Sequence, residues 1–275
     1  MPDVAGDRGP LLDDFLLTLT GKPRPRVCFV GTASGDDASY VEKFHSAFRG
    51  RADTTVLALF NSEPEGAIPV DQLERVLEHH VVYVGGGSTA NLLAVWRLHG
   101  LVTVLEEAAA RGTVLAGISA GMNCWFEGSS TDSLGPLAPL TDGLGFLPGS
   151  ACPHYFAEAD RRAAYLGMVA SGELSDGYAV DDGVALLWQD GELVEAVSER
   201  PDGQALRGTT EPPSRLPSTC ASSVILNQRR AALTVFPVDD PRPGLPSRRP
   251  RFLQPLTVHG PEDAKLISED STSSL

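Results

Sequence analysis

The 275-residue sequence has no apolar run long enough to cross a membrane, which argues against an integral membrane protein. Basic residues are scarce: 22 Lys and Arg stand against 36 Asp and Glu, and no basic stripe is present, which argues against nucleic-acid binding. The four cysteines are widely spaced and form no Cys-x-x-Cys pair, as expected of reduced thiols rather than of a disulfide or zinc framework. The polar, acidic first eight residues do not resemble a signal peptide. We therefore expect a cytoplasmic protein.

The first two thirds of the sequence alternate between short apolar segments and helical patterns. Strands are expected at 26–32, 54–60, 81–84 and 113–116, and helices at 40–48, 70–79, 90–98 and 101–110. Buried strands separated by helices predict an α/β fold with a mostly parallel sheet flanked by helices. Ligands bind such sheets at the carboxyl ends of the strands.

The sequence changes character after residue 207. Nearly half of the 21 prolines lie beyond it, and Ser and Arg are frequent there. Two runs at 178–188 and 193–197 predict a late hairpin that closes an α/β domain over residues 1–207. Residues 208–275 are expected to form a largely disordered tail, with isolated strands at most at 223–226 and 231–236, because such a composition buries little apolar surface. Removing the tail is then expected to leave activity intact.

The segment Gly117-Ile-Ser-Ala-Gly121 carries the strongest chemical signal. It joins an apolar strand to a helix-compatible stretch, Met122–Phe126, and has the Gly-x-Ser-x-Gly spacing of a nucleophile elbow. In that arrangement Ser119 is exposed at the end of the strand, and the N–H of Ala120 faces a developing oxyanion. A glycine-rich junction with an incidental serine is the alternative.

A serine nucleophile needs a base, and the base needs an orienting acid. His154 is the best candidate base, because it lies on a loop just after Pro153, whereas most other histidines fall on predicted helices. Asp132 and Glu158 compete as the orienting acid. Asp181-Asp182-Gly183 fits a hairpin turn between two apolar runs.

Four motifs in order resemble the peptidase E family of serine peptidases (family S51, with aspartyl dipeptidase and cyanophycinase). They are Gly85-Gly-Gly-Ser-Thr-Ala-Asn-Leu-Leu, Ala116-Gly-Ile-Ser-Ala-Gly-Met-Asn-Cys-Trp-Phe-Glu, Thr131-Asp-Ser and Cys152-Pro-His-Tyr. The resemblance covers about residues 26–197 and implies a fold related to class I glutamine amidotransferases. It implies Ser119 as nucleophile, His154 as base and Asp132 as the third member, with an oxyanion hole formed by the amides of Gly86 or Gly87 and of Ala120.

Two departures from the family pattern concern the substrate. Ser88 follows the glycine triplet where aspartyl dipeptidases usually carry Asn, and the acid motif is closer to the serine than theirs. The resemblance implies cleavage after an N-terminal aspartate, which needs a cation, and Arg161 and Arg162 are the candidates, as a substrate-binding pair or as an exposed pair. Tyr155 either holds the substrate amine or packs in the core.

Neither a metal nor a phosphate ligand is predicted. No cluster of histidines and carboxylates suggests a metal, and no lysine follows the glycine triplet at P-loop spacing. We expect a cofactor-free serine exopeptidase that hydrolyses small peptides, Asp-X dipeptides among them, through an acyl-enzyme. The alternatives are a weakly active or non-catalytic amidotransferase-like binding protein and a serine esterase. The sequence leaves the choice between a monomer and a homodimer open.

Overall fold

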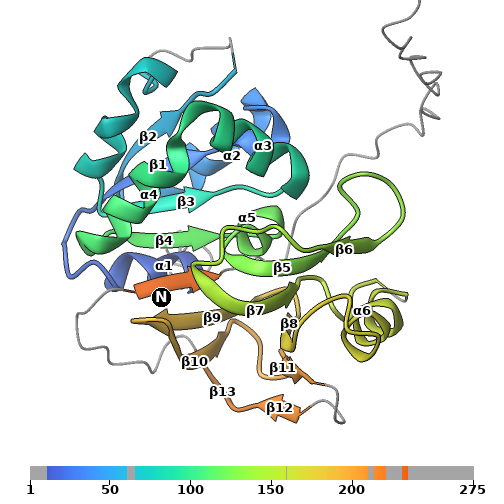
Figure 1. Ribbon diagram of the computed structural model, residues 1–275. Coiled ribbons are helices and arrows are strands. Elements are labelled where there is room, and N and C mark those ends of the chain that lie inside the picture. Colours follow the sequence, from blue (N-terminus) through green and yellow to red (C-terminus); the bar gives the residue numbers. More distant parts are fainter. Residues whose placement is uncertain (1–10, 61–65, 159, 210–213, 221–230, 235–275) are drawn as a thin grey trace, which may run out of the picture. The chain divides into compact units, whose positions relative to one another are not determined.

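The computed structural model describes residues 11–60, 66–158, 160–209, 214–220 and 231–234. Its larger sheet has eight strands in the order β13-β10-β9-β14-β4-β3-β1-β2 (Figure 1). The parallel strands at one side are β1 (Arg26–Val30), β2 (Asp53–Leu57), β3 (Val81–Val84) and β4 (Val114–Gly117). β1, β3 and β4 are almost entirely buried, which explains why their sequences are continuously apolar.

One helix precedes these strands, and others connect them and pack against the sheet (Figure 1). They are α1 (Leu11–Thr18), η1 (Thr32–Ser34), α2 (Ala38–Phe48), η2 (Val70–Glu78), α3 (Thr89–His99) and α4 (Leu101–Ala110), of which η1 and η2 are 3₁₀ helices. Their buried faces share one core with the strands, in which Phe29, Trp96 and Leu105 are large buried members. The predicted fold class and the four predicted strand–helix pairs are confirmed. None of the helices in the described ranges is long and apolar enough to cross a membrane.

A second sheet of six strands, which the sequence patterns did not predict, lies beside the first. Its order is β12-β11-β8-β7-β5-β6. The strands are β5 (Phe126–Thr131), β6 (Ala138–Leu140), β7 (Leu147–Cys152), β8 (Gly177–Val180), β11 (Ala205–Gly208) and β12 (Ser214–Leu216), and the helices nearby are α5 (Ala120–Asn123) and α6 (Arg161–Ala170). The helix predicted after Ser119 is α5, which is only about one turn long, and β5 begins soon after it at Phe126.

Aromatic side chains join the two sheets. Trp188 of β9 (Val184–Gln189) contacts Tyr178 of β8 edge-to-face, with ring centroids 5.0 Å apart, and Phe126 of β5 at 5.8 Å. Edge-to-face pairs of this kind contribute about 0.5–1.5 kcal/mol each beyond the apolar area they bury. The relative position of the sheets is therefore fixed by specific ring contacts as well as by general burial.

The predicted late hairpin forms only in part. β9 and β10 (Glu192–Ser198) pair antiparallel as expected, but the first predicted run is split between β8, in the six-stranded sheet, and β9, in the eight-stranded sheet. Asp181, Asp182 and Gly183 therefore do not form a hairpin turn. They connect strands of two different sheets.

The boundary predicted at residue 207 differs from the structure. β12 extends β11, β13 (Ser218–Cys220) pairs with β10, and β14 (Ala231–Thr234) lies between β4 and β9 inside the large sheet. The compact unit accordingly runs through Asp239. The expected strand at 223–226 lies outside the described residues.

Asp13, in the first turn of α1, is a buried carboxyl group with an unusual titration. Burial raises its pKa from 3.8 to about 7, opposed by Arg51 and reinforced by Glu199 and Asp14. Between these pH values the folded chain holds a proton that the unfolded chain releases, so this group lowers stability as the pH rises from about 4 to 7.

We expect Asp13→Asn to raise the free energy of unfolding by about 1–3 kcal/mol at pH 8, and to change it far less at pH 4. Urea titrations between pH 4 and 8 measure this difference. Asp71→Asn is the matched control, because Asp71 is an exposed aspartate in the first turn of η2. A pH dependence that persists unchanged in Asp13→Asn would contradict the assignment.

Candidate active site

The backbone at Ser119 has the strained geometry of a nucleophile elbow. Ser119 lies two residues beyond the end of β4 and has φ 54° and ψ −110°, a conformation that non-glycine residues rarely adopt. The flanking glycines are sterically required: a Cβ at Gly117 would lie 2.0 Å from the carbonyl oxygen of Gly121, and one at Gly121 would lie 2.3 Å from that of Val84. The Gly-x-Ser-x-Gly spacing therefore has a direct structural cause.

His154 lies within hydrogen-bonding distance of the serine. It follows the carboxyl end of β7, and its Nε2 is 3.0 Å from Ser119 Oγ. Its Nδ1 is 2.6 Å from Oδ1 of Asp182, which follows the carboxyl end of β8. An ionised carboxylate can only accept, so Nδ1 carries the proton in this arrangement and Nε2 is left as the acceptor for the serine proton. The histidine is largely shielded, with 12% of its side chain exposed, against 31% for Asp182.

Asp182 is the carboxylate that contacts His154, whereas the family resemblance implies Asp132 in that place. Asp132 lies beyond β5, with its carboxylate 3.7 Å from Nη2 of Arg161. Glu158, the competing candidate, binds the same guanidinium at 2.7 Å. The sequence does not point to Asp182, because Asp181-Asp182-Gly183 between two apolar runs fits a hairpin turn. The signal that could have found Asp182 is its place two residues after the apolar strand β8, which resembles the place of Ser119 two residues after β4.

Comparison with known proteins is consistent with this geometry. The profile of Peptidase family S51 matches residues 6–196. The chain is also 45% identical over 196 residues to the uncharacterized peptidase YgaJ of Bacillus subtilis (strain 168), covering 71% of this chain and 83% of that protein. The chain belongs to peptidase family S51.

Two other similar proteins share lower sequence identity with this chain. Peptidase E of Pasteurella multocida (strain Pm70) is 27% identical over 150 residues, covering 54% of this chain and 60% of that protein. The crystal structure of a peptidase from an acI-B1 Actinobacterium shares the fold, with a TM-score of 0.56 at 20% identity over 78% of this chain and 91% of that one. The matched S51 region ends before β14, which therefore lies outside it.

The backbone N–H groups that are expected to form an oxyanion hole differ in whether they already donate a hydrogen bond within the protein. The N–H of Gly86 donates to the hydroxyl of Tyr40 at 3.1 Å. Within the described part of the chain, the N–H groups of Gly87 and Ala120 form no hydrogen bond. A Cβ built on Gly86 would lie 3.3 Å from the Cβ of Ser119, so the glycine loop borders the serine closely.

The predicted substrate-binding residues occupy different environments. Arg161 is only 4% exposed and is held by Glu158 and Asp132, so its charge is already compensated. Arg162 is exposed, and its guanidinium carbon lies 6.0 Å from the ring centroid of Tyr155 and 5.6 Å from that of Phe156. Tyr155 is buried in the smaller core behind α6.

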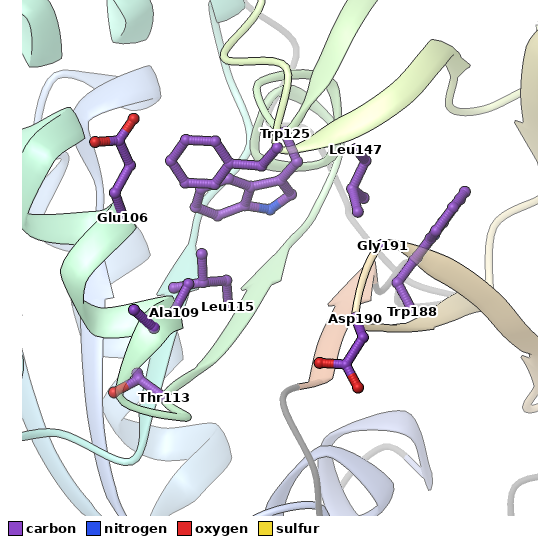
Figure 2. A pocket seen from close by; sticks show the side chains of 11 residues that line it. Glu106, Ala109, Thr113, Leu115, Trp125, Leu147, Trp188, Asp190 and Gly191 are labelled. Atoms are coloured by element: carbon purple, nitrogen blue, oxygen red, sulfur yellow. The ribbon is translucent and has the colours of Figure 1, made fainter.

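A cavity of about 410 Å³ lies elsewhere, toward the amino-terminal end of β4 (Figure 2). Trp125, Phe146, Leu147 and Trp188 give it an apolar lining, with Glu106 and Asp190 among its other lining residues. Ser119, His154 and Asp182 do not contribute to it. Across the described ranges, no three His, Cys, Asp or Glu side chains gather as metal ligands would.

Proposed function

We propose that this S51 peptidase is a serine exopeptidase that hydrolyses small peptides through an acyl-enzyme at Ser119. The observation that supports the proposal is the chain of two contacts, 3.0 Å from Ser119 Oγ to His154 Nε2 and 2.6 Å from His154 Nδ1 to Asp182. Each distance lies in the range that general-base activation of a hydroxyl requires.

The proposed reaction has two halves. Ser119 Oγ attacks the peptide carbonyl while its proton passes to His154 Nε2, and Asp182 stabilises the imidazolium that forms. The C–N bond breaks as His154 protonates the leaving amine. A water molecule then loses a proton to His154 and attacks the ester, and Ser119 recovers its proton as the acid product leaves. The amides of Gly87 and Ala120 face the negative charge in both halves.

We propose dipeptides with an N-terminal acidic residue as the first substrates to test, with Arg162 as the cation that pairs with the acidic side chain. Arg162 is a better candidate than Arg161 for binding the acidic side chain, because Glu158 and Asp132 already compensate the charge of Arg161. Arg162 is exposed and forms no ion pair among the described residues. A guanidinium matches a carboxylate in two parallel hydrogen bonds.

Labelling with a fluorophosphonate probe tests the serine chemistry. We expect one adduct, located on Ser119 by mass spectrometry, that is absent in Ser119→Ala and lost or strongly slowed in His154→Ala. Wild-type chain that stays unlabelled and hydrolyses no dipeptide would overturn the proposal in favour of a binding protein.

A panel of Asp-X, Glu-X and neutral dipeptides, with matched ester substrates, then tests the specificity. Arg162→Gln should reduce kcat/KM for the acidic dipeptides about tenfold or more and change the neutral ones little. Hydrolysis of apolar esters without hydrolysis of any dipeptide would identify an esterase instead.

A further inference from the structure

Tyr40, which the sequence motifs did not single out, lies at the edge of the proposed active site. It belongs to the first turn of α2, where the carboxylate of Asp37 accepts its backbone N–H at 2.9 Å. Its hydroxyl oxygen accepts the N–H of Gly86 at 3.1 Å. A Cβ built on Gly86 would lie 3.8 Å from that hydroxyl and 3.3 Å from the Cβ of Ser119. Gly86 is thus close to both Tyr40 and the proposed nucleophile.

The ring of Tyr40 is also held in place, by contacts with other aromatic rings and with Gly85. It packs edge-to-face on Phe29, with ring centroids 5.2 Å apart, and Phe29 stacks on Phe44 of the same helix at 4.7 Å. A Cβ at Gly85 would lie 3.1 Å from Cε1 of Tyr40 and 3.0 Å from Cζ of Phe29. The end of β3 therefore fits directly against both rings, and this contact fixes the hydroxyl with respect to the glycine triplet.

The hydrogen bond from Gly86 to Tyr40 gives the N–H groups of Gly86 and Gly87 different roles. Gly86 cannot offer its N–H to an oxyanion while it donates to Tyr40, whereas Gly87 can. Gly87 has φ 139°, and a Cβ there would lie 2.2 Å from the carbonyl oxygen of Ala33, which also accepts the N–H of Ser88 at 2.9 Å. The Gly86–Gly87 peptide is consequently held on both sides, by Tyr40 before it and by Ala33 after it.

We propose that Tyr40 is a positioning residue of the oxyanion hole: its hydroxyl orients the Gly86–Gly87 peptide so that the N–H of Gly87, together with that of Ala120, binds the developing oxyanion. The inference rests on the proposed function. Preorganised donors stabilise charge that exists only in the transition state, so the contribution of Tyr40 acts on kcat more than on KM.

Tyr40→Phe tests this proposal, because it keeps the ring contacts and removes only the hydroxyl. We expect kcat for the best dipeptide, and the second-order rate constant for labelling by the fluorophosphonate, to fall about 10- to 100-fold, with KM changed less than about threefold. This loss is smaller than the 10²–10³-fold cost of removing an oxyanion donor outright. Tyr83→Phe is the matched control: Tyr83 packs in the same ring cluster, 6.3 Å from Phe29, and should leave both rates unchanged.

The outcomes separate the two proposals. Wild-type rates in Tyr40→Phe, in a protein that labels and hydrolyses normally, overturn the role of Tyr40 and leave the serine chemistry standing. Equal losses in Tyr40→Phe and Tyr83→Phe, or a rise in KM with unchanged kcat, also overturn it, because they indicate a structural or substrate-binding role. A wild-type chain that neither labels nor hydrolyses dipeptides overturns the proposed function and the role of Tyr40 with it.

Discussion

Asp182→Asn should reduce kcat by about 10³- to 10⁴-fold, the loss that accompanies a wrongly oriented histidine tautomer in a serine triad. The Nδ1 of His154 donates to Asp182 at 2.6 Å. An asparagine amide placed there can present its NH₂ group to Nδ1, which favours the tautomer with the proton on Nε2. That proton would face Ser119 and remove the acceptor that the reaction needs. Steady-state kinetics on the best dipeptide measure the loss, and KM should change little.

Asp132→Asn is the matched control for this prediction. It makes the same substitution at the residue that the family resemblance implied, but Asp132 lies 3.7 Å from Arg161, and Glu158 binds that guanidinium more closely. We expect kcat to fall less than about fivefold. Circular dichroism and thermal unfolding of both variants exclude misfolding as the cause. A large loss of kcat in Asp132→Asn, with a near-normal kcat in Asp182→Asn, would show that Asp132 and not Asp182 is the third member of the triad.

Ending the chain at residue 230 should destabilise the protein severely, whereas ending it at Asp239 should not. The shorter chain loses β14, which pairs with β4 from Ala232 to Thr234 and with β9 from Ala231 to Thr234. Its loss leaves both neighbours as unpaired edges in the middle of a sheet. At about 1 kcal/mol for each lost hydrogen bond, we expect a deficit of roughly 3 kcal/mol or more. This corresponds to a fall in Tm of about 6–12 °C, with a tendency to aggregate.

Differential scanning calorimetry of the two truncated chains beside the full chain measures this effect. The chain that ends at Asp239 keeps the whole compact unit and should unfold within about 2 °C of the full chain. Activity follows stability here, because Thr234 pairs with Gly117, two residues before the nucleophile. Normal stability and activity in the chain ending at residue 230 would show that β14 is dispensable, as the sequence pattern suggested.

The sequence predicted the parts of the site that depend on local patterns. Ser119 was found because the elbow imposes glycines at two nearby positions, and His154 because a proline and the loss of helical pattern mark its loop. The first four strands were found because buried parallel strands are continuously apolar. Each of these signals is contained in a few consecutive residues.

The missed features depend on contacts between distant segments. Asp182 is distinguished from Asp181 and Asp132 only by how the two sheets meet, and Tyr40 only by the packing of α2 against the glycine triplet. The strands β5 and β7 are rich in Gly and Ser and do not show the apolar pattern expected of buried strands. β14 falls in the apolar run at 231–236, but the Pro-rich sequence around it predicts an isolated strand in a tail rather than a central strand of the large sheet. In such segments, pairing with neighbouring strands determines the structure more than the intrinsic strand propensity of the residues does.

The three proposed catalytic residues are carried by two different sheets. Ser119 follows a strand of the eight-stranded sheet, while His154 and Asp182 follow strands of the six-stranded one. A slight sliding or opening of one sheet on the other would separate base from nucleophile without unfolding either sheet. The contacts of Trp188 with Phe126 and Tyr178 hold the two sheets together and so keep the base beside the nucleophile, although none of the three rings belongs to the triad.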